Sequence, residues 1–380
     1  RGDRQVREVG PDIKRWRSLG KRVAVGRVVG VEGSGPRDPG ATMAVSEDSE
    51  VAGSVSGGCV EGAVVTEALD VLATGVPRLC TFGYSDDEAF AVGLTCGGTV
   101  HVFIEPLDDL HQEVLDSGPE EPVVLATEFA GPRLGAKLLA GPGREASGTL
   151  GDVDLDRVVR RDALAELDSG LTVTRHYGLH GEAREEDVSV FIESFAPPPR
   201  MLIFGAVDFT AALARVAKVL GYRVTVCDAR PVFATARRFP MADEVVVDWP
   251  DRHLATLGDS LGPRDAVCVL THDAKFDVPA IQGALRTRVG YIGAMGSRRT
   301  TAERNERLVA SGVSDTDLAR VRAPIGLDLG GRTPEETAVS ICAEIIALRA
   351  GADGKRAPAL RDTEGPIHAG GDAGHVADGA

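Results

Sequence analysis

The sequence lacks several features that would place it in a common functional class. Its apolar runs fall short of the roughly 18 residues that cross a membrane, and residues 1–5 carry no apolar signal core, so we expect a cytoplasmic protein without a membrane span. A basic surplus is missing as well, because the net charge is −15. Nucleic acid is therefore an unsuitable partner, since its phosphates attract basic surfaces. The six cysteines include no C-x-x-C pair and no zinc-type spacing, which excludes the usual zinc modules.

The length and composition predict a soluble protein of two or three domains. The chain has 380 residues, of which 43% are hydrophobic and 26% charged. Three prolines within residues 196–200 exclude a helix and favour an extended linker. Beyond Ala350 the composition shifts to Gly, Ala, Asp and Pro, which predicts disorder. We expect α/β domains over residues 1–106, 107–196 and 197–350, followed by a flexible tail over 351–380.

The stretch Gly53-Ser-Val-Ser-Gly-Gly-Cys-Val-Glu-Gly62 is the first candidate functional site. A helix-patterned apolar run follows it, which places Cys59 at or beside a helix N-terminus. There the positive end of the helix dipole favours the thiolate, which is a nucleophile and a soft-metal ligand. The glycines let the backbone turn sharply or approach a ligand closely. The structural alternative is that Cys59 is a small buried hydrophobe, as many free cysteines are.

Residues 107–196 resemble a worn copy of residues 1–106. Gly40 corresponds to Gly135 and Gly53 to Gly148, both at an offset of 95 residues. The helix pattern recurs at the same offset, with Val64, Ala68, Leu69 and Leu72 repeated as Val159, Ala163, Leu164 and Leu167. The motif Val-Phe-Ile-Glu also occurs twice, ending at Glu105 and at Glu193. We therefore predict a duplicated α/β unit.

The second copy lacks the chemistry of the first. Cys59 is replaced by Asp154, and Ser-Gly-Gly-Cys by Gly-Asp-Val-Asp. Both copies need their apolar positions in order to fold, whereas the first alone carries a thiol between glycines and a helix. This contrast favours a functional role for Cys59 over a structural one.

The C-terminal half opens like a dinucleotide-binding unit. A buried-type strand ends at Gly205, a helix is expected over 208–220, and a strand over 223–227 ends before Asp228. The glycine fingerprint is incomplete, because Val207 stands where the second glycine lets the backbone approach a pyrophosphate. We expect a Rossmann-like doubly wound parallel sheet, with Gly205 and Asp228 as doubtful nucleotide contacts.

Two further groups are expected at the carboxyl ends of strands in this sheet. His272 and Asp273 follow one apolar run and could act as ligands or as ordinary hydrogen-bonding groups. Gly293-Ala-Met-Gly-Ser-Arg-Arg299 follows the next and suits an oxyanion at a helix start, although a solvated helix cap is the equal alternative. The last predicted helix starts at the cap Thr333-Pro-Glu-Glu336 and is expected to pack through Val339, Cys342, Ile345 and Ile346.

Taken together, these stretches resemble the xanthine dehydrogenase accessory family, XdhC/CoxI, across residues 15–350. The motifs that carry the resemblance are Gly53-Ser-Val-Ser-Gly-Gly-Cys-Val-Glu61, Leu94-Thr-Cys-Gly-Gly98, Met201–Gly205 with Asp228, His272-Asp273, Tyr291-Ile-Gly-Ala-Met-Gly-Ser-Arg-Arg299, and Ala323-Pro-Ile-Gly-Leu-Asp-Leu-Gly330 with Thr333-Pro-Glu-Glu336. The chain departs from the family at Val207-Asp-Phe209, where members usually read Gly-His-Val.

The resemblance implies a maturation factor for molybdenum hydroxylases, with no turnover of its own. Such a factor binds the molybdenum–pterin cofactor, supports its sulfuration by a cysteine desulfurase and passes it to an apo-hydroxylase of the xanthine or carbon monoxide dehydrogenase type. Cys59 would be the metal ligand, with Cys96 as a second thiol. The candidate cofactor contacts are Ser56, Gly57, Gly58, Cys59, Glu61, Cys96, Gly97, Gly98, His272, Asp273, Gly296, Ser297, Arg298 and Arg299.

Two other functions stay open. One is an NAD(P)-dependent oxidoreductase that uses the Rossmann-like domain. Because of Val207, we expect no NAD(P) binding by this domain. The other is a scaffold that joins the desulfurase to the hydroxylase. A homodimer is expected from the resemblance and from the prevalence of symmetric oligomers.

Overall fold

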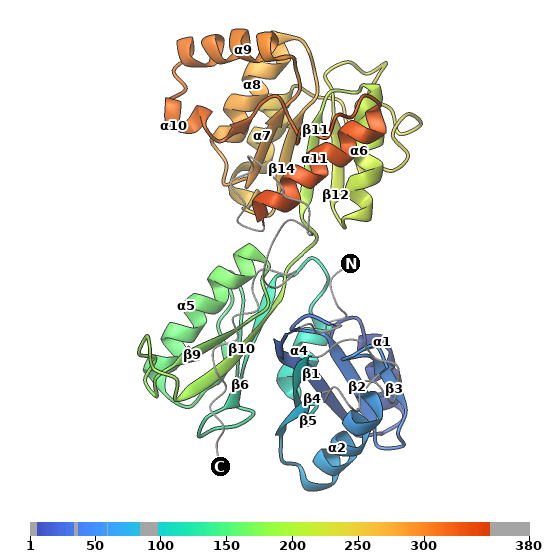
Figure 1. Cartoon of the computed structure of the whole chain (residues 1–380), viewed down its shortest axis with the longest axis vertical. Helices are drawn as coiled ribbons and strands as arrows, with labels where there is room; N and C mark the ends of the chain where they lie inside the picture. The colour runs from blue at the N-terminus through green and yellow to red at the C-terminus, as the bar shows by residue number, and fades with distance from the viewer. Residues whose placement is uncertain (1–5, 34–36, 59, 84–97, 350–380) are drawn as a thin grey trace. The chain divides into compact units, whose positions relative to one another are not determined.

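The computed structural model describes residues 6–33, 37–58, 60–83 and 98–349. The chain forms two compact units that divide between Pro197 and Pro198 (Figure 1). No helix in the described ranges combines the length and the apolar character that crossing a membrane requires. The tail expected over 351–380 lies outside these ranges.

The N-terminal unit starts with a helix followed by a five-stranded antiparallel sheet. The elements are α1 (Gly10–Ser18), β1 (Val23–Glu32), β2 (Thr42–Ser46), β3 (Val51–Gly53), α2 (Glu61–Thr74), β4 (Arg78–Gly83) and β5 (Thr99–Pro106). The strand order is β3-β2-β1-β5-β4. Alternate side chains of β1 and β5, including Val28 and Val102, pack with Val64 of α2 in one apolar cluster. The remaining side chains of these strands point to the other face.

The same sequence of elements then repeats. It comprises α4 (Asp109–Asp116), β6 (Val123–Ala130), β7 (Lys137–Ala140), β8 (Ser147–Thr149), α5 (Val153–Ser169), β9 (Val173–Tyr177) and β10 (Val188–Phe195). The strand order β8-β7-β6-β10-β9 is the order of the first sheet with each strand replaced by its counterpart. The predicted duplication is confirmed, and it also includes the leading helices α1 and α4.

The two sheets pack through the faces that α2 and α5 leave uncovered. Four side chains form the centre of one shared cluster, namely Val29, Phe103, Phe129 and Phe191. Val29 is equivalent to Phe129, and Phe103 to Phe191. The strand pairing shows this equivalence, because Val28 pairs with Val102 in the first sheet as Glu128 pairs with Val190 in the second. Each copy therefore contributes the same positions to the seam between the sheets.

Beside this apolar cluster lies Arg27, whose side chain is fully buried. One guanidinium nitrogen is paired with Glu105 on β5 and another with Glu193 on β10. Those glutamates are the equivalent last residues of the repeated Val-Phe-Ile-Glu motif. Lys137 also lies against Glu105, with 2.5 Å between Nζ and Oε2, and against Asp108 at 2.7 Å. Arg27 thus joins one carboxylate from each copy.

Hydrogen bonds and charges set the protonation states in this network. Burial alone would raise the pKa of Glu105, but Arg27 and His111 outweigh it and lower the pKa to about 2. Burial likewise opposes the charge on His111, yet its hydrogen bond with Asp108 and its ion-pair contact with Glu105 raise its pKa. The carboxylate of Glu105 therefore stays ionised, whereas burial raises the pKa of Glu193 despite its pairing with Arg27.

The C-terminal unit is a doubly wound parallel sheet. Its elements are β11 (Arg200–Phe204), α6 (Asp208–Val219), β12 (Arg223–Cys227), β13 (Glu244–Val246), α7 (Pro250–Leu257), β14 (Ala266–Val269), α8 (Ala274–Leu285), β15 (Tyr291–Ala294), α9 (Arg298–Ala310), α10 (Asp315–Leu318), β16 (Val321–Arg322) and α11 (Pro334–Arg349). The strand order β13-β12-β11-β14-β15-β16 is that of a Rossmann fold. The predicted fold class is confirmed for both units.

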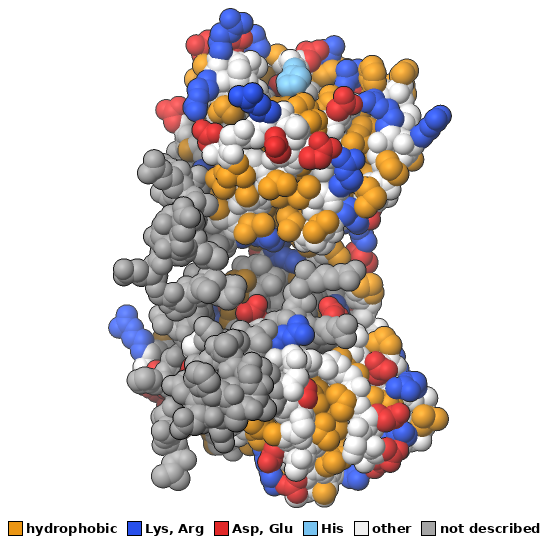
Figure 2. Space-filling view, turned by 45° about the vertical axis from the view of Figure 1, so that its right-hand side comes forward, with side chains coloured by type: hydrophobic (Ala, Val, Ile, Leu, Met, Phe, Trp, Pro, Cys, Tyr) orange, Lys and Arg blue, Asp and Glu red, His pale blue; other side chains and the backbone are white. Residues whose placement is uncertain are grey.

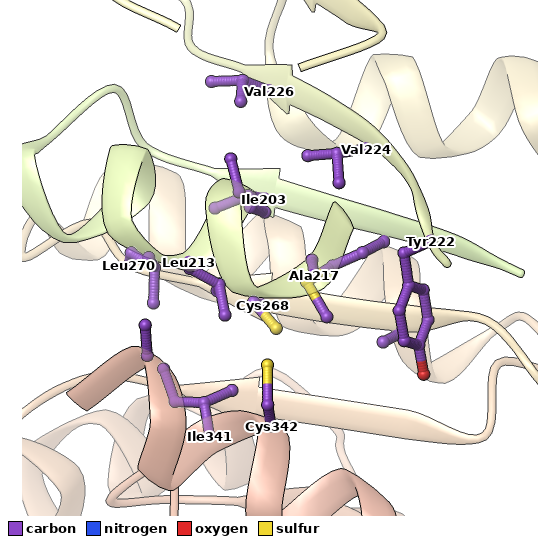
Figure 3. Packing of buried hydrophobic residues seen from close by; sticks show 14 of the residues in the cluster. Ile203, Leu213, Ala217, Tyr222, Val224, Val226, Cys268, Leu270, Ile341 and Cys342 are labelled. Atoms are coloured by element: carbon purple, nitrogen blue, oxygen red, sulfur yellow. The ribbon is translucent and has the colours of Figure 1, made fainter. Parts of the chain in front are cut away.

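Helices cover both faces of this sheet. α6 and α11 pack on one face, where Leu213 and Ile341 meet across Ile203 and Cys268 (Figure 3). α7, α8 and α9 share the apolar cluster of the other face. Acidic and basic side chains are interspersed on the surface seen in Figure 2.

The packing face of α11 differs from the expected one. Cys342 and Ile345 are buried as predicted, whereas Val339 is 50% and Ile346 45% exposed. The buried face includes Ala338 and Ile341. It also contains Glu344, because its carboxylate accepts hydrogen bonds from Tyr291 Oη at 2.6 Å and from the Gly326 N–H at 2.9 Å. Because Glu344 is buried with these two donors, the buried face of α11 differs from the face that its apolar residues alone predict.

Replacement of Arg27 by Met should strongly destabilise the N-terminal unit. It leaves two buried carboxylates without their shared cation, a loss of about 3–5 kcal/mol. Urea unfolding at pH 7 measures it through the fluorescence of the buried Trp16, in a Trp249→Phe background. The exposed Arg157, which is paired with Asp154 on the surface, supplies the control Arg157→Gln, which should unfold like the parent. A loss below about 1 kcal/mol in Arg27→Met would contradict the role of the network.

Candidate functional site

The loop between β3 and α2 is folded around one carboxylate. Glu61, the first residue of α2, accepts hydrogen bonds from Ser54 Oγ at 2.7 Å and from Ser56 Oγ at 2.6 Å. It also accepts the backbone N–H groups of Ser56 at 2.9 Å, Gly57 at 3.1 Å and Gly58 at 2.9 Å. A carboxylate at a helix N-terminus is further stabilised by the helix dipole.

These donors keep Glu61 ionised. Burial would raise its pKa, but the hydrogen bonds from Ser56 and Ser54 lower it to about 2. The backbone N–H groups of Ser56, Gly57 and Gly58 are thus used within the protein. Ser56 and Glu61 fasten the loop, and their contact with a cofactor stays a prediction.

The second copy has the same fastening. Thr149 Oγ1 donates to Asp156 Oδ2 at 2.6 Å, and the Leu150 N–H donates to Asp156 Oδ1 at 2.7 Å. Thr149 and Asp156 stand 95 residues after Ser54 and Glu61. This pair of residues therefore belongs to the duplicated fold and is not special to the first copy.

The copies differ most in chemical character at residues 56–59, inside the fastened loop. In the second copy Asp152 caps α5 by accepting the N–H groups of Asp154 and Leu155, each at 3.0 Å. In the first copy α2 starts after Val60 without any side-chain cap. The chain instead makes a turn through Gly57 and Gly58, whose φ angles of 83° and 127° suit glycine. Both glycines are exposed, with no atom near where a Cβ would be.

The two cysteine segments start and end at the same end of the first sheet. Cys59, Cys96 and Gly97 lie outside the described residues. Gly98 is buried just before β5. The strand ladders place the start of β5 and the end of β3 at the same end of the sheet. Val55 and Val60 of the loop also share a cluster with Val100 of β5.

In the C-terminal unit, the residues proposed for a nucleotide are engaged within the protein. Asp228 accepts the Ala206 N–H at 2.8 Å and two donors of Arg230 at 2.9 and 2.7 Å. Against burial, these bonds lower the pKa of Asp228. Val207 is extended and packs on the core. Gly205 is required, because a Cβ there would lie 2.8 Å from the Thr271 side chain. The strand-end architecture is present, but its acidic residue is occupied.

The other candidates follow β14 and β15 at the same edge of the sheet. His272 is exposed, and Asp273 caps α8 while pairing with Lys275 at 3.0 Å. Ser297 caps α9 by accepting the Thr300 N–H at 3.1 Å. Gly296 precedes this cap with a φ of 150°. Arg298 and Arg299 start the helix with exposed side chains.

Sequence reasoning missed a buried arginine at this edge. Arg304 is 2% exposed, and its Nη1 donates to Met295 O at 2.9 Å and pairs with Asp277 at 3.2 Å. The helical spacing of Arg304 from its apolar neighbour Leu308 could have predicted this burial. Thr301, Arg304 and Leu308 form one buried stripe of α9, where a charged residue among inward positions indicates a buried partner.

The sequence candidates thus fall into two groups, one in each unit. The first is the loop before α2 with Gly98, and the second is the carboxyl edge of the parallel sheet with Gly205, Asp228, His272 and residues 296–299. Among the described residues no three His, Cys, Asp or Glu side chains form a metal-binding group.

Known proteins share this architecture over most of its length. Family models match at residues 16–83, for the XdhC and CoxI family, and at residues 201–345, for the XdhC Rossmann domain. A probable xanthine dehydrogenase subunit from Bacillus subtilis (strain 168) is 30% identical over 331 residues, which cover 85% of this chain and 92% of that protein. The molybdenum cofactor insertion chaperone PaoD of Escherichia coli (strain K12) is 27% identical, with coverage of 87% and 84%.

A solved structure agrees with the fold. The crystal structure of a xanthine dehydrogenase from Bacillus halodurans has a TM-score of 0.65 at 25% identity, and the match covers 93% of this chain and 98% of that one. These matches define a class in which an XdhC/CoxI unit precedes an XdhC Rossmann domain. The chain belongs to the XdhC/CoxI family.

Replacement of Glu61 by Gln should release the loop, because the amide NH₂ takes the place of one accepting oxygen and would face the N–H group of either Gly57 or Gly58. We expect amide exchange at residues 56–58 to become faster by roughly tenfold or more as these hydrogen bonds are lost. The matched variant Asp156→Asn should instead speed exchange at Leu150. Equal protection of residues 56–58 in Glu61→Gln and the wild type would contradict the role of Glu61.

The same loop should be sensitive to acid. Because the folded pKa of Glu61 is about 2, below its ordinary 4.5, its stabilisation is complete above pH 4.5. It is lost as the pH falls towards 2. Amide exchange at residues 56–58 across this interval, corrected for intrinsic rates, provides the measurement. Protection that is already lost at pH 5 would be inconsistent with the lowered pKa.

Proposed function

We propose that this protein binds the molybdenum–pterin cofactor as cargo, protects it and delivers it to an apo-hydroxylase of the xanthine or carbon monoxide dehydrogenase type. Membership of the XdhC/CoxI family and the similarity to a named molybdenum cofactor insertion chaperone support a role in molybdenum hydroxylase maturation. In the finer proposal it also supports sulfuration of the cofactor by a cysteine desulfurase. The protein itself has no turnover.

The observation that carries this proposal is the difference between the two copies of the fastened loop. Folding requires Ser54 with Glu61, and Thr149 with Asp156, which each copy has. Only the first copy replaces the capping aspartate by two exposed glycines and a cysteine. A change that leaves a helix start uncapped and removes two side chains from the surface does not serve stability. It suits the approach of a ligand.

The chemistry of this loop fits a soft metal better than an anion. The loop N–H groups are already bound to Glu61, so they are not the binding site for a pterin phosphate. The exposed glycines leave room beside position 59, where a thiolate would supply the ligand that molybdenum takes from cysteine. Gly98 is a further candidate at this end of the sheet, and Cys96 and Gly97 stay predictions because they lie outside the described residues. Arg298 and Arg299 remain candidates for anionic parts of the cofactor.

The variant Cys59→Ser should lose most of the bound molybdenum, because a hydroxyl is a poor soft-metal ligand. Molybdenum and pterin contents are measured on protein that is coexpressed with the cofactor pathway. Cys80→Ser is the matched control, since burial raises the pKa of the Cys80 thiol to about 11 and keeps it protonated. Equal molybdenum retention by Cys59→Ser and the wild type would refute the role of Cys59.

The order of the parallel sheet favours one competing function, an NAD(P)-dependent oxidoreductase. We expect no saturable NAD(P)H binding, because Val207 fills the place of the fingerprint glycine and Asp228 is bound to Arg230. Calorimetry of the full chain with NADH and NADPH tests this. A dissociation constant in the micromolar range would favour the oxidoreductase.

The remaining alternative is a scaffold that joins the desulfurase to the hydroxylase. The scaffold hypothesis predicts a different experimental result from the chaperone hypothesis. A scaffold would capture both partners in a pull-down while retaining no cofactor. A homodimer also belongs to the proposal, and light scattering that gives a mass near 39.8 kDa would reject it.

A further inference from the structure

A small cavity lies at the amino edge of the parallel sheet, opposite the carboxyl edge discussed above. Its volume is about 140 Å³, and its lining includes Tyr222, Arg264, Asp265, Tyr291 and Arg349. Tyr222 and Asp265 directly precede β12 and β14, and Tyr291 starts β15. Arg349 comes from the last turn of α11. All of these residues belong to the C-terminal unit.

The Tyr222 hydroxyl has no hydrogen-bond partner among the described residues, although the side chain is 1% exposed. Its ring packs beside Val224 at one end of the core cluster (Figure 3). A buried hydroxyl that has lost its water and gained no partner destabilises a fold. Phe would supply the same apolar ring at this position without that penalty. The hydroxyl therefore indicates a missing acceptor or donor in the cavity that it lines.

The charge around the cavity is positive. Arg349 lies over the Tyr222 ring, with its guanidinium carbon 6.0 Å from the ring centre. Arg264 lines the same cavity as Tyr222 and Arg349. Burial raises the pKa of the Tyr222 hydroxyl, and Arg349 and Arg264 both act to lower it. The carboxylate of Asp265 is engaged elsewhere, with the Arg200 side chain at 2.9 Å and the Gly262 N–H at 2.9 Å.

One local feature acts in the opposite direction. A helix C-terminus carries about half a negative charge, and the last described turn of α11 lines the cavity. Two guanidinium groups outweigh that half charge. The lining thus contains two guanidinium groups and one carboxylate, and the carboxylate of Asp265 is already paired with Arg200.

We propose that this cavity binds a small oxyanion, held by the guanidinium groups of Arg349 and Arg264 and by the Tyr222 hydroxyl. The volume limits the ligand, since at about 30 Å³ per water it holds roughly five waters. A phosphate or a short carboxylate fits that space, which lies at the edge of the sheet opposite Arg298 and Arg299. The site is thus separate from the cofactor role proposed above and does not depend on it.

Calorimetry and thermal unfolding of the full-length protein test the site. The probes are inorganic phosphate and acetate, with sodium chloride at matched ionic strength as the reference. We expect one saturable site and an unfolding temperature that rises above the chloride reference. Phosphate binding alone identifies a tetrahedral oxyanion, and acetate binding alone identifies a carboxylate. Binding of neither anion overturns the proposal.

Variants separate this site from a general effect of charge. Arg349→Gln should weaken the anion by roughly tenfold or more, because a charge-assisted bond is lost. Arg349→Lys should retain part of the affinity. Tyr222→Phe should bind several-fold more weakly while the ligand-free protein unfolds at the same or a higher temperature. Arg286, an exposed residue outside the lining, supplies the control Arg286→Gln, which should bind like the wild type. Wild-type affinity in both Arg349→Gln and Tyr222→Phe would overturn the assignment.

Discussion

Arg27 lies between two sheets of the same design and pairs with a glutamate from each. A guanidinium buried without partners is too costly to keep in an apolar seam, so it needs both carboxylates to remain there. Because Glu105 and Glu193 are equivalent residues of the two copies, this contact fixes how one copy faces the other. Once these faces are joined, the outer faces are left to α2 and α5, and the loop before α2 becomes part of an ordered edge.

Duplication then separates folding from function. Each copy keeps a serine or threonine and an acid that hold the loop before its helix. The second copy fills the positions between them with a capping aspartate, which is the ordinary way to satisfy a helix start. The first copy gives up that cap and has Gly57, Gly58 and Cys59 in its sequence instead. The loss is tolerated because Glu61 holds the loop from inside.

The sequence was informative where the signal was local or repeated. The 95-residue offset correctly predicted the duplication, since it spans β2, β3 and the following helix, where no residues are inserted. The Rossmann order followed from strand and helix periodicity. Arg27 was not predicted, because its partners lie 78 and 166 residues away, and an isolated arginine in a strand normally indicates an exposed position. Val339 and Ile346 were misjudged because the burial of Glu344 depends on Tyr291, which lies on another strand. The N–H groups of Ser56, Gly57 and Gly58 donate to Glu61. From the glycines of the sequence alone, these N–H groups would have been assigned to a ligand.

The central claim is that function resides in residues 56–59, where the first loop lacks the capping aspartate of the second. The most direct measurement gives residues 56–59 the second copy's sequence, through Ser56→Gly, Gly57→Asp, Gly58→Val and Cys59→Asp. Molybdenum content and urea stability are then compared with the wild type. We expect a protein that stays folded at pH 7, although it loses the hydrogen bond from Ser56 Oγ to Glu61, and that retains almost no molybdenum. Wild-type retention in this loop exchange would contradict the claim.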